Sequence, residues 1–251
     1  MPTLVLIRHG ATRWGQENRF AGWGDTPLSV AGWTEARKAA QTLRRANLEF
    51  DVAYCSRLLR ARETLEAITE TMAAETLPVV VDWRLNERHY GQLQEVTRPA
   101  AIAEHGNAQV VAWRRDYHAV PPLLEDDDPR WLEQVARFAD IDPTRLPRGE
   151  SLGDAAARVR PVFEEEIGPA LKAGKRVLVV AHTSSIRGLA RVIENLDDEA
   201  SAAFRIATAI PRIYQLDDDL TPQSSQDLAG GGRAGVRYWA NKLKPRGLGR
   251  F

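Results

Sequence analysis

Cysteine is almost absent from this chain, since Cys55 is the only one in 251 residues. A single cysteine excludes an internal disulfide and suits a reducing compartment, so a cytoplasmic location is expected. No apolar run approaches the roughly 20 residues of a membrane span, and no basic segment followed by an apolar signal region begins the sequence. We therefore expect a soluble protein with no membrane partner.

Net charge is absent too, because 34 basic residues balance 34 acidic ones. No overall field would attract nucleic acid, so any anion site must be a local cluster, and a small molecule is the expected partner. The sequence also lacks the Cys/His and HExxH spacings of zinc sites, the GxxxxGK(S/T) of a P-loop and the GxGxxG of dinucleotide sites. These absences favour catalysis without a metal.

Hydrophobic content of 43% and charged content of 27% are ordinary for a globular protein. Short apolar runs alternate with segments of helical periodicity, and Ser29 and Ser56 are the expected N-caps of the first two helices. Expected strands span 4–7, 51–54, 77–81, 176–181 and 213–216, and expected helices span 28–47, 56–72, 152–172 and 185–195. The alternation predicts an α/β fold with a mainly parallel, helix-flanked sheet.

The alternation of strands and helices is interrupted between about residues 84 and 149. Expected short helices at 99–105 and 109–118 predict a helical insertion over the sheet there. The acidic EDDD run, residues 125–128, is expected to be a solvated loop. Residues 1–220 are predicted to form one catalytic domain. Residues 221–251 are predicted to form a flexible connection rich in Ser, Gly and Gln, then a short strand and a basic tail.

Two apolar runs each end on a histidine. LVLIRHG contains Arg8 and His9, and VLVVAH ends on His182, with Arg187 a short distance beyond. Because open α/β sheets place ligands at the carboxyl ends of their strands, these side chains are expected to meet at one edge. Imidazole and guanidinium groups together predict an anion site, with phosphate as the first candidate.

A neutral imidazole can attack phosphorus near neutral pH, because its ordinary pKa of about 6.5 leaves a lone pair free. Phosphoryl transfer then needs mainly positive charge around the phosphate oxygens, for which Arg8, Arg60 and His182 are candidates. An isolated RHG tripeptide would favour a core histidine bonded to the backbone, and the surrounding motifs favour the nucleophile instead. Composition alone would likewise make Arg60 a solvated helix arginine.

LNERHYG, residues 85–91, follows the third expected strand, and its Glu87 could both donate and accept a proton. A solvated loop carboxylate is the plainer alternative. WRR, residues 113–115, could clamp an anion through forked guanidinium donors, or simply form the exposed face of a helix.

These motifs resemble the histidine phosphatase superfamily over residues 4–216, and more closely its phosphoglycerate mutase branch, which 2,3-bisphosphoglycerate primes. ENRFAGW, LNERHYG, WRR and a later PP pair, in this order, carry the closer resemblance. The resemblance implies His9 as nucleophile, Glu87 as proton carrier, and Arg8, Arg60 and His182 as phosphate ligands. For the substrate, a small phosphorylated metabolite, it implies Gly22, Tyr90, Arg98, Arg114 and Arg115 as ligands.

Several positions depart from the mutase pattern. Mutases usually carry Glu, Asn and Thr where this chain has Ala11, Gly15 and Ala21, and Gly-Asn where it has Thr183 and Ser184. Gly15 and Ala21 lack donors that would contact the substrate, which favours hydrolysis over isomerisation.

The presence of LNERHYG and WRR nevertheless favours the mutase, so interconversion of 2- and 3-phosphoglycerate is the main hypothesis. A homodimer is also expected. The alternative is a phosphohistidine-dependent phosphatase acting on a small phosphometabolite. A third reading is a non-catalytic module that binds a phosphometabolite, but it predicts loss of His9, His182 or Glu87, and all three are present.

Overall fold

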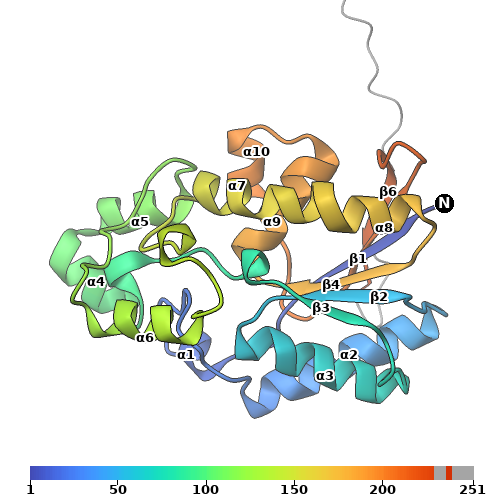
Figure 1. The fold of residues 1–251 in the computed structure, drawn as a ribbon, viewed down its shortest axis with the longest axis horizontal. Coiled ribbons are helices and arrows are strands. Elements are labelled where there is room, and N and C mark those ends of the chain that lie inside the picture. Colours follow the sequence, from blue (N-terminus) through green and yellow to red (C-terminus); the bar gives the residue numbers. More distant parts are fainter. Residues whose placement is uncertain (229–235, 239–251) are drawn as a thin grey trace, which may run out of the picture.

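A computed structural model describes residues 1–228 and 236–238 (Figure 1). Its strands form one seven-stranded sheet in the order β3-β2-β4-β1-β5-β6-β7. The strands are β1 (Thr3–Arg8), β2 (Val52–Cys55), β3 (Val79–Val81), β4 (Val177–Ala181), β5 (Arg212–Leu216), β6 (Pro222–Asp227) and β7 (Val236–Tyr238). β1 to β4 are parallel, whereas β5, β6 and β7 each run antiparallel to the preceding strand in the sheet.

Helices cover both faces of the sheet (Figure 1). Side chains alternate along β1, so that Leu4 and Leu6 face one side, and Val5 and Ile7 the other. The helices over Val5 and Ile7 are α2 (Val30–Arg45) and α3 (Leu59–Met72). Those over Leu4 and Leu6 are α7 (Leu152–Val162), α8 (Gly168–Lys172) and α9 (Thr183–Glu194). The predicted α/β fold with a helix-flanked sheet is confirmed.

The helix expected over residues 152–172 is continuous but contains a π-helical turn, Phe163–Ile167, between α7 and α8. Ser29 caps α2 as predicted, with its hydroxyl accepting a hydrogen bond from the main chain of Gly32. The second expected cap is wrong. The N-cap residue of α3 is Leu58, and the Asp25 carboxylate accepts from the main chain of Leu59, the first helical residue. The Ser56 hydroxyl accepts from the main chain of Leu58, one residue before the helix, and also contacts Asn86 and His182.

The sheet is more mixed than expected because of the path after β4. α9 carries the chain back across the sheet, and α10 (Asp198–Ala203) and residues 204–211 return it to the carboxyl edge. There Thr208 forms a β-bridge with Arg8, and the next strand, β5, starts from this edge and pairs antiparallel with β1. This return places residues 204–208 beside the end of β1.

The insertion lies at one end of the molecule (Figure 1). Its helices are α4 (Arg98–His105), α5 (Asn107–Arg115) and α6 (Pro129–Arg137), and the short α1 (Arg13–Gln16) follows β1. The sequence did not predict α6. Asp128 is not part of a featureless solvated loop, since its carboxylate caps α6 and pairs with Arg130.

Residues 222–227, expected within a flexible connection, instead form β6, because the chain turns back after Leu216 and pairs with β5. The short strand expected near residue 236 is present as β7. Residues 229–235 and 239–251, including most of the expected connection and tail, lie outside the described residues. Among the described residues, no helix combines the length and the apolar character that crossing a membrane requires.

Candidate active site

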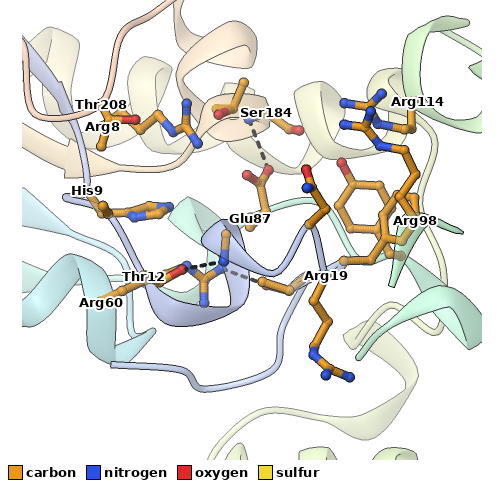
Figure 2. A pocket seen from close by; sticks show the side chains of 18 of the residues that line it. Arg8, His9, Thr12, Arg19, Arg60, Glu87, Arg98, Arg114, Ser184 and Thr208 are labelled. Carbon is orange, nitrogen blue, oxygen red and sulfur yellow. Dashed lines mark hydrogen bonds between the residues drawn. The ribbon is translucent and has the colours of Figure 1, made fainter. Parts of the chain in front are cut away.

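A cavity of about 580 Å³ opens where β1 and β4 end. Most of the sequence-predicted site residues line it, namely Arg8, His9, Gly22, Arg60, Glu87, Tyr90, Arg98, Arg114 and Arg115. His182 lies behind the wall, fully buried, with its ring centroid 5.0 Å from that of His9. Figure 2 shows His9, Arg8 and Arg60 at one end of the cavity, Arg98 and Arg114 at the other, and Glu87 between them.

The main chain fixes the ring of His9. Its Nδ1 lies 2.8 Å from the carbonyl oxygen of Gly10, so Nδ1 carries the proton and Nε2 keeps its lone pair. Burial, followed by the charges of Arg60 and Arg8, holds the pKa of His9 well below 6.5. His9 is therefore neutral at physiological pH, as a nucleophile must be.

A hydrogen-bond chain sets the tautomer of His182. Asn86 Oδ1 accepts from the main chain of Arg57 at 3.1 Å and from the Ser56 hydroxyl at 2.9 Å. The Ser56 oxygen must then accept from Nε2–H of His182, 2.7 Å away. This leaves Nδ1 of His182 deprotonated, buried and without a hydrogen-bond partner.

Burial, and then the charge of Arg60, holds the pKa of His182 well below its ordinary value. A bound phosphoryl dianion would favour a proton on Nδ1, because opposite charges stabilise one another in a site shielded from water. His182 is therefore suited to donate a hydrogen bond to a phosphoryl group on the neighbouring His9.

Arg60 is a buried arginine rather than a solvated one, with 1% of its surface exposed. Its guanidinium donates to the carbonyl oxygens of Gly24 at 2.9 Å and Gly22 at 2.7 Å. Burial lowers its pKa to about 10, so it stays cationic. At Arg8, Nε is buried and has no partner. Both arginines therefore hold positive charge ready for an anion.

Glu87 faces the cavity between the two groups of arginines (Figure 2). One oxygen of its carboxylate accepts main-chain hydrogen bonds from Ser184 at 3.0 Å and Arg88 at 2.8 Å. Desolvation would raise the pKa of Glu87, but a hydrogen bond from the Ser184 side chain, the two main-chain hydrogen bonds and the charge of Arg60 outweigh it and lower the pKa. Because Ser184 also acts through its main chain, replacing the family's usual Asn retains that contact.

A buried ion pair supports the main chain of Glu87 from behind. All five N–H donors of Arg158 are used: two bind the Glu150 carboxylate at 2.7 and 2.9 Å, and three bind main-chain carbonyls of residues 84–87 at 2.6 to 3.2 Å. Trp23 donates to the Glu87 carbonyl at 2.6 Å. Arg158 and Glu150 are therefore positioning residues for the carboxylate.

The outer end of the cavity is cationic. Arg98, Arg114 and Arg115 line it beside Tyr90, and the buried Arg88 stacks on the Tyr90 ring at 4.5 Å. Burial, followed by the charge of Arg98, lowers the pKa of Arg114. WRR is therefore part of the cavity wall rather than a merely exposed helix face. Among the described residues, no cluster of three or more His, Cys, Asp or Glu side chains could hold a metal.

Sequence reasoning did not assign several other residues that line the cavity, among them Thr12, Asn18, Arg19, Arg205 and Thr208. Arg187 also lines it, as its place after His182 suggested. Arg205 and Thr208 reach the cavity only because the chain returns to the sheet edge before β5. No local sequence pattern predicts this return.

The histidine phosphatase superfamily (branch 1) model matches residues 4–128 and 123–221. The chain belongs to this superfamily. It is 28% identical to a mycobacterial glucosyl-3-phosphoglycerate phosphatase solved with VO3, with 86% of this chain and 93% of that one covered and a TM-score of 0.66. A protein described as mycobacterial hydrolase 1 is 26% identical, with 95% and 97% covered and a TM-score of 0.66.

A putative alpha-ribazole-5'-P phosphatase from Escherichia coli shares the fold at 22% identity, with 86% of this chain and 92% of that chain covered and a TM-score of 0.64. The superfamily expected from the motifs is confirmed. The phosphatases among these relatives do not confirm the finer expectation of the mutase branch.

Replacing Gly22 with Ala should damage the phosphate site. Gly22 has a φ of +50°, and an added Cβ would lie 2.4 Å from the Gln94 side-chain oxygen, which accepts a hydrogen bond from the main chain of Trp23. Either this Gln94 contact or the Gly22 carbonyl that holds Arg60 must therefore shift. We expect kcat/KM to fall on the order of 10-fold or more. Gly174→Ala is the matched control, since Gly174 has a φ of +80° with open space around it and does not line the cavity. Equal activity in the two variants would contradict this role.

Replacing Arg158 with Lys should lower kcat. Lysine has three donors and no planar fork, so it cannot hold both Glu150 and the 84–87 main chain, and a displaced carboxylate costs up to about 10²-fold in rate. The inhibition constant of inorganic phosphate should change much less, because the ligands of the phosphate are not involved. Arg160→Lys, at an exposed position in the same helix, is the control. Equal losses in kcat and phosphate affinity would assign Arg158 to general stability.

Acid should destabilise the protein through its buried histidines. Burial lowers the pKa of His89 to about 3, against about 6.5 for an unfolded histidine. Its contribution to stability is therefore complete above pH 6.5 and is lost as the pH falls toward 3, by up to about 1.4 kcal/mol per pH unit. Chemical unfolding between pH 7 and 4 measures this slope. His89→Gln should flatten it, whereas His118→Gln, at an exposed side chain, should not.

Proposed function

We propose that the protein is a phosphohistidine-dependent phosphatase that hydrolyses a small phosphate monoester with an anionic leaving group. The observation that carries this proposal is the fixed tautomer of His9. Its Nδ1 is held by the Gly10 carbonyl, which leaves Nε2 as the nucleophile beside Arg8 and Arg60. The cationic outer end of the cavity supports an anionic group on the leaving molecule.

The proposed reaction has two steps. Glu87 is ionised in the free protein, so it first accepts the proton that the monoanionic phosphate ester carries into the site. Nε2 of His9 then attacks phosphorus, the bond from phosphorus to the leaving oxygen breaks, and Glu87 passes that proton to the leaving oxygen. Water then attacks phosphorus, Glu87 accepts a proton from the water, and the N–P bond breaks to release phosphate and neutral His9. Arg8, Arg60 and His182 stabilise the charge on the phosphoryl oxygens in both steps.

Hydrolysis is favoured over isomerisation by the relatives and by the cavity wall. Solved structures with the same fold include a phosphatase at 28% identity. Gly15 and Ala21 line the cavity where mutases usually carry Asn and Thr. A mutase must hold its bisphosphate intermediate while it reorients, and fewer side-chain donors weaken that hold.

Phosphoglycerate mutase activity is the second candidate, because the side chains of Tyr90, Arg98, Arg114 and Arg115 that suggested it all line the cavity. Only the mutase hypothesis requires priming by 2,3-bisphosphoglycerate. The primer, the homodimer and the cytoplasmic location stay predictions from the sequence.

Intact-mass analysis and product separation test the proposal together. After brief incubation with 3-phosphoglycerate or 2,3-bisphosphoglycerate, the wild-type protein should gain one acid-labile phosphoryl group and release phosphate faster than it forms 2-phosphoglycerate. His9→Ala should lose both labelling and turnover. His182→Ala should still be labelled, more slowly, because it loses a phosphate ligand and not the nucleophile. Labelling of His9→Ala would refute the nucleophile, and faster isomerisation than phosphate release would favour the mutase.

A further inference from the structure

The cavity carries more positive charge than one phosphate and one carboxylate require. Beyond Arg8 and Arg60, its lining includes Arg98, Arg114, Arg115, Arg187 and Arg205, and among the described residues that line it Glu87 is the only acidic one. Among the described residues, no carboxylate lies within 4.0 Å of any of those five guanidinium groups. Like charges gathered without counterions repel one another, so the folded site favours an anionic ligand.

Arg187 and Arg205 come from the α9 side rather than from the insertion. Arg187 is half-buried, and its Nε donates to the carbonyl oxygen of Phe204 at 3.0 Å. Phe204 directly precedes Arg205, so this hydrogen bond ties the two arginines together. Because the Nε of Arg187 is occupied, its remaining donors are the ones available to a ligand.

The two groups of arginines have a common neighbour in Tyr90. Tyr90 lines the same cavity as both groups of arginines, and Arg88 stacks on its ring at 4.5 Å. The arginines of the insertion and those of the α9 side are therefore walls of one outer site around Tyr90.

We propose that Arg187 and Arg205 are specificity-determining residues, which complete with Arg98, Arg114 and Arg115 a subsite for a leaving group with at least two negative charges. A second phosphate or a pair of carboxylates has this chemistry. A single carboxylate would offset one of five cations, whereas a phosphate offers two charges and three acceptor oxygens for forked donors. This inference rests on the proposed phosphatase activity.

Four phosphate monoesters test the subsite by their kcat/KM values. They are p-nitrophenyl phosphate with an uncharged leaving group, 3-phosphoglycerate with one carboxylate, 2-phosphotartronate with two, and fructose 1,6-bisphosphate with a second phosphate. The wild-type protein should prefer the last two, and which of these it prefers identifies the group. A preference for 3-phosphoglycerate over both would overturn the inference. Failure to hydrolyse any of the four would instead overturn the proposed function.

Arg205→Ala should lower kcat/KM for the preferred doubly charged substrate at least about 10-fold more than for p-nitrophenyl phosphate, since hydrogen bonds to charged groups are lost only in the first case. Arg187→Ala should do the same. Arg205→Lys, which keeps the charge without the fork, should recover part of the selectivity. Arg45→Ala, an exposed arginine on α2, is the control. Equal losses on all substrates in Arg205→Ala would overturn the subsite.

Discussion

The site depends on keeping a neutral imidazole beside buried guanidinium groups. Arg60 and Arg8 disfavour a proton on His9, so the charges that would bind a phosphate also preserve the nucleophile. Burying Arg60 would be unfavourable without partners, and the carbonyl groups of Gly22 and Gly24 supply them. Hydrogen bonds from Leu59 to the Asp25 carboxylate and from Leu28 to the Glu63 carboxylate hold the same segment against α3.

Local signals in the sequence were enough to predict the parts of the site that sit on the parallel strands. The apolar runs that become β1 and β4 each end at a histidine, and the general rule for parallel sheets brings their carboxyl ends together. The burial of Arg60 could not be predicted in this way. Its partners lie 36 and 38 residues away in the chain, and only the tertiary structure brings their carbonyl groups to it.

The wrong expectations have physical causes. Ser56 stands two residues before the N-cap of α3, and its hydroxyl contacts the main chain of Leu58 as well as Asn86 and His182. The first N–H of the helix is satisfied by the Asp25 carboxylate, which the sequence pattern does not place there. α6 did leave a signal, since Asp128 followed by Pro129 is typical of a helix start. No local sequence signal indicates the direction of β5, because that direction depends on the return of the chain to the end of β1.

Reaction chemistry and specificity are held by different kinds of contact. Main-chain groups hold His9 and Glu87, so substitutions such as Ser184 for the usual Asn leave those contacts in place. The outer arginines stand on the insertion, on α9 and on the segment after α10, none of which supplies a strand of the parallel part of the sheet. On the proposed assignment, changes there would alter which leaving group is bound without disturbing the nucleophile. One fold can therefore serve several phosphate esters with the same phosphohistidine chemistry.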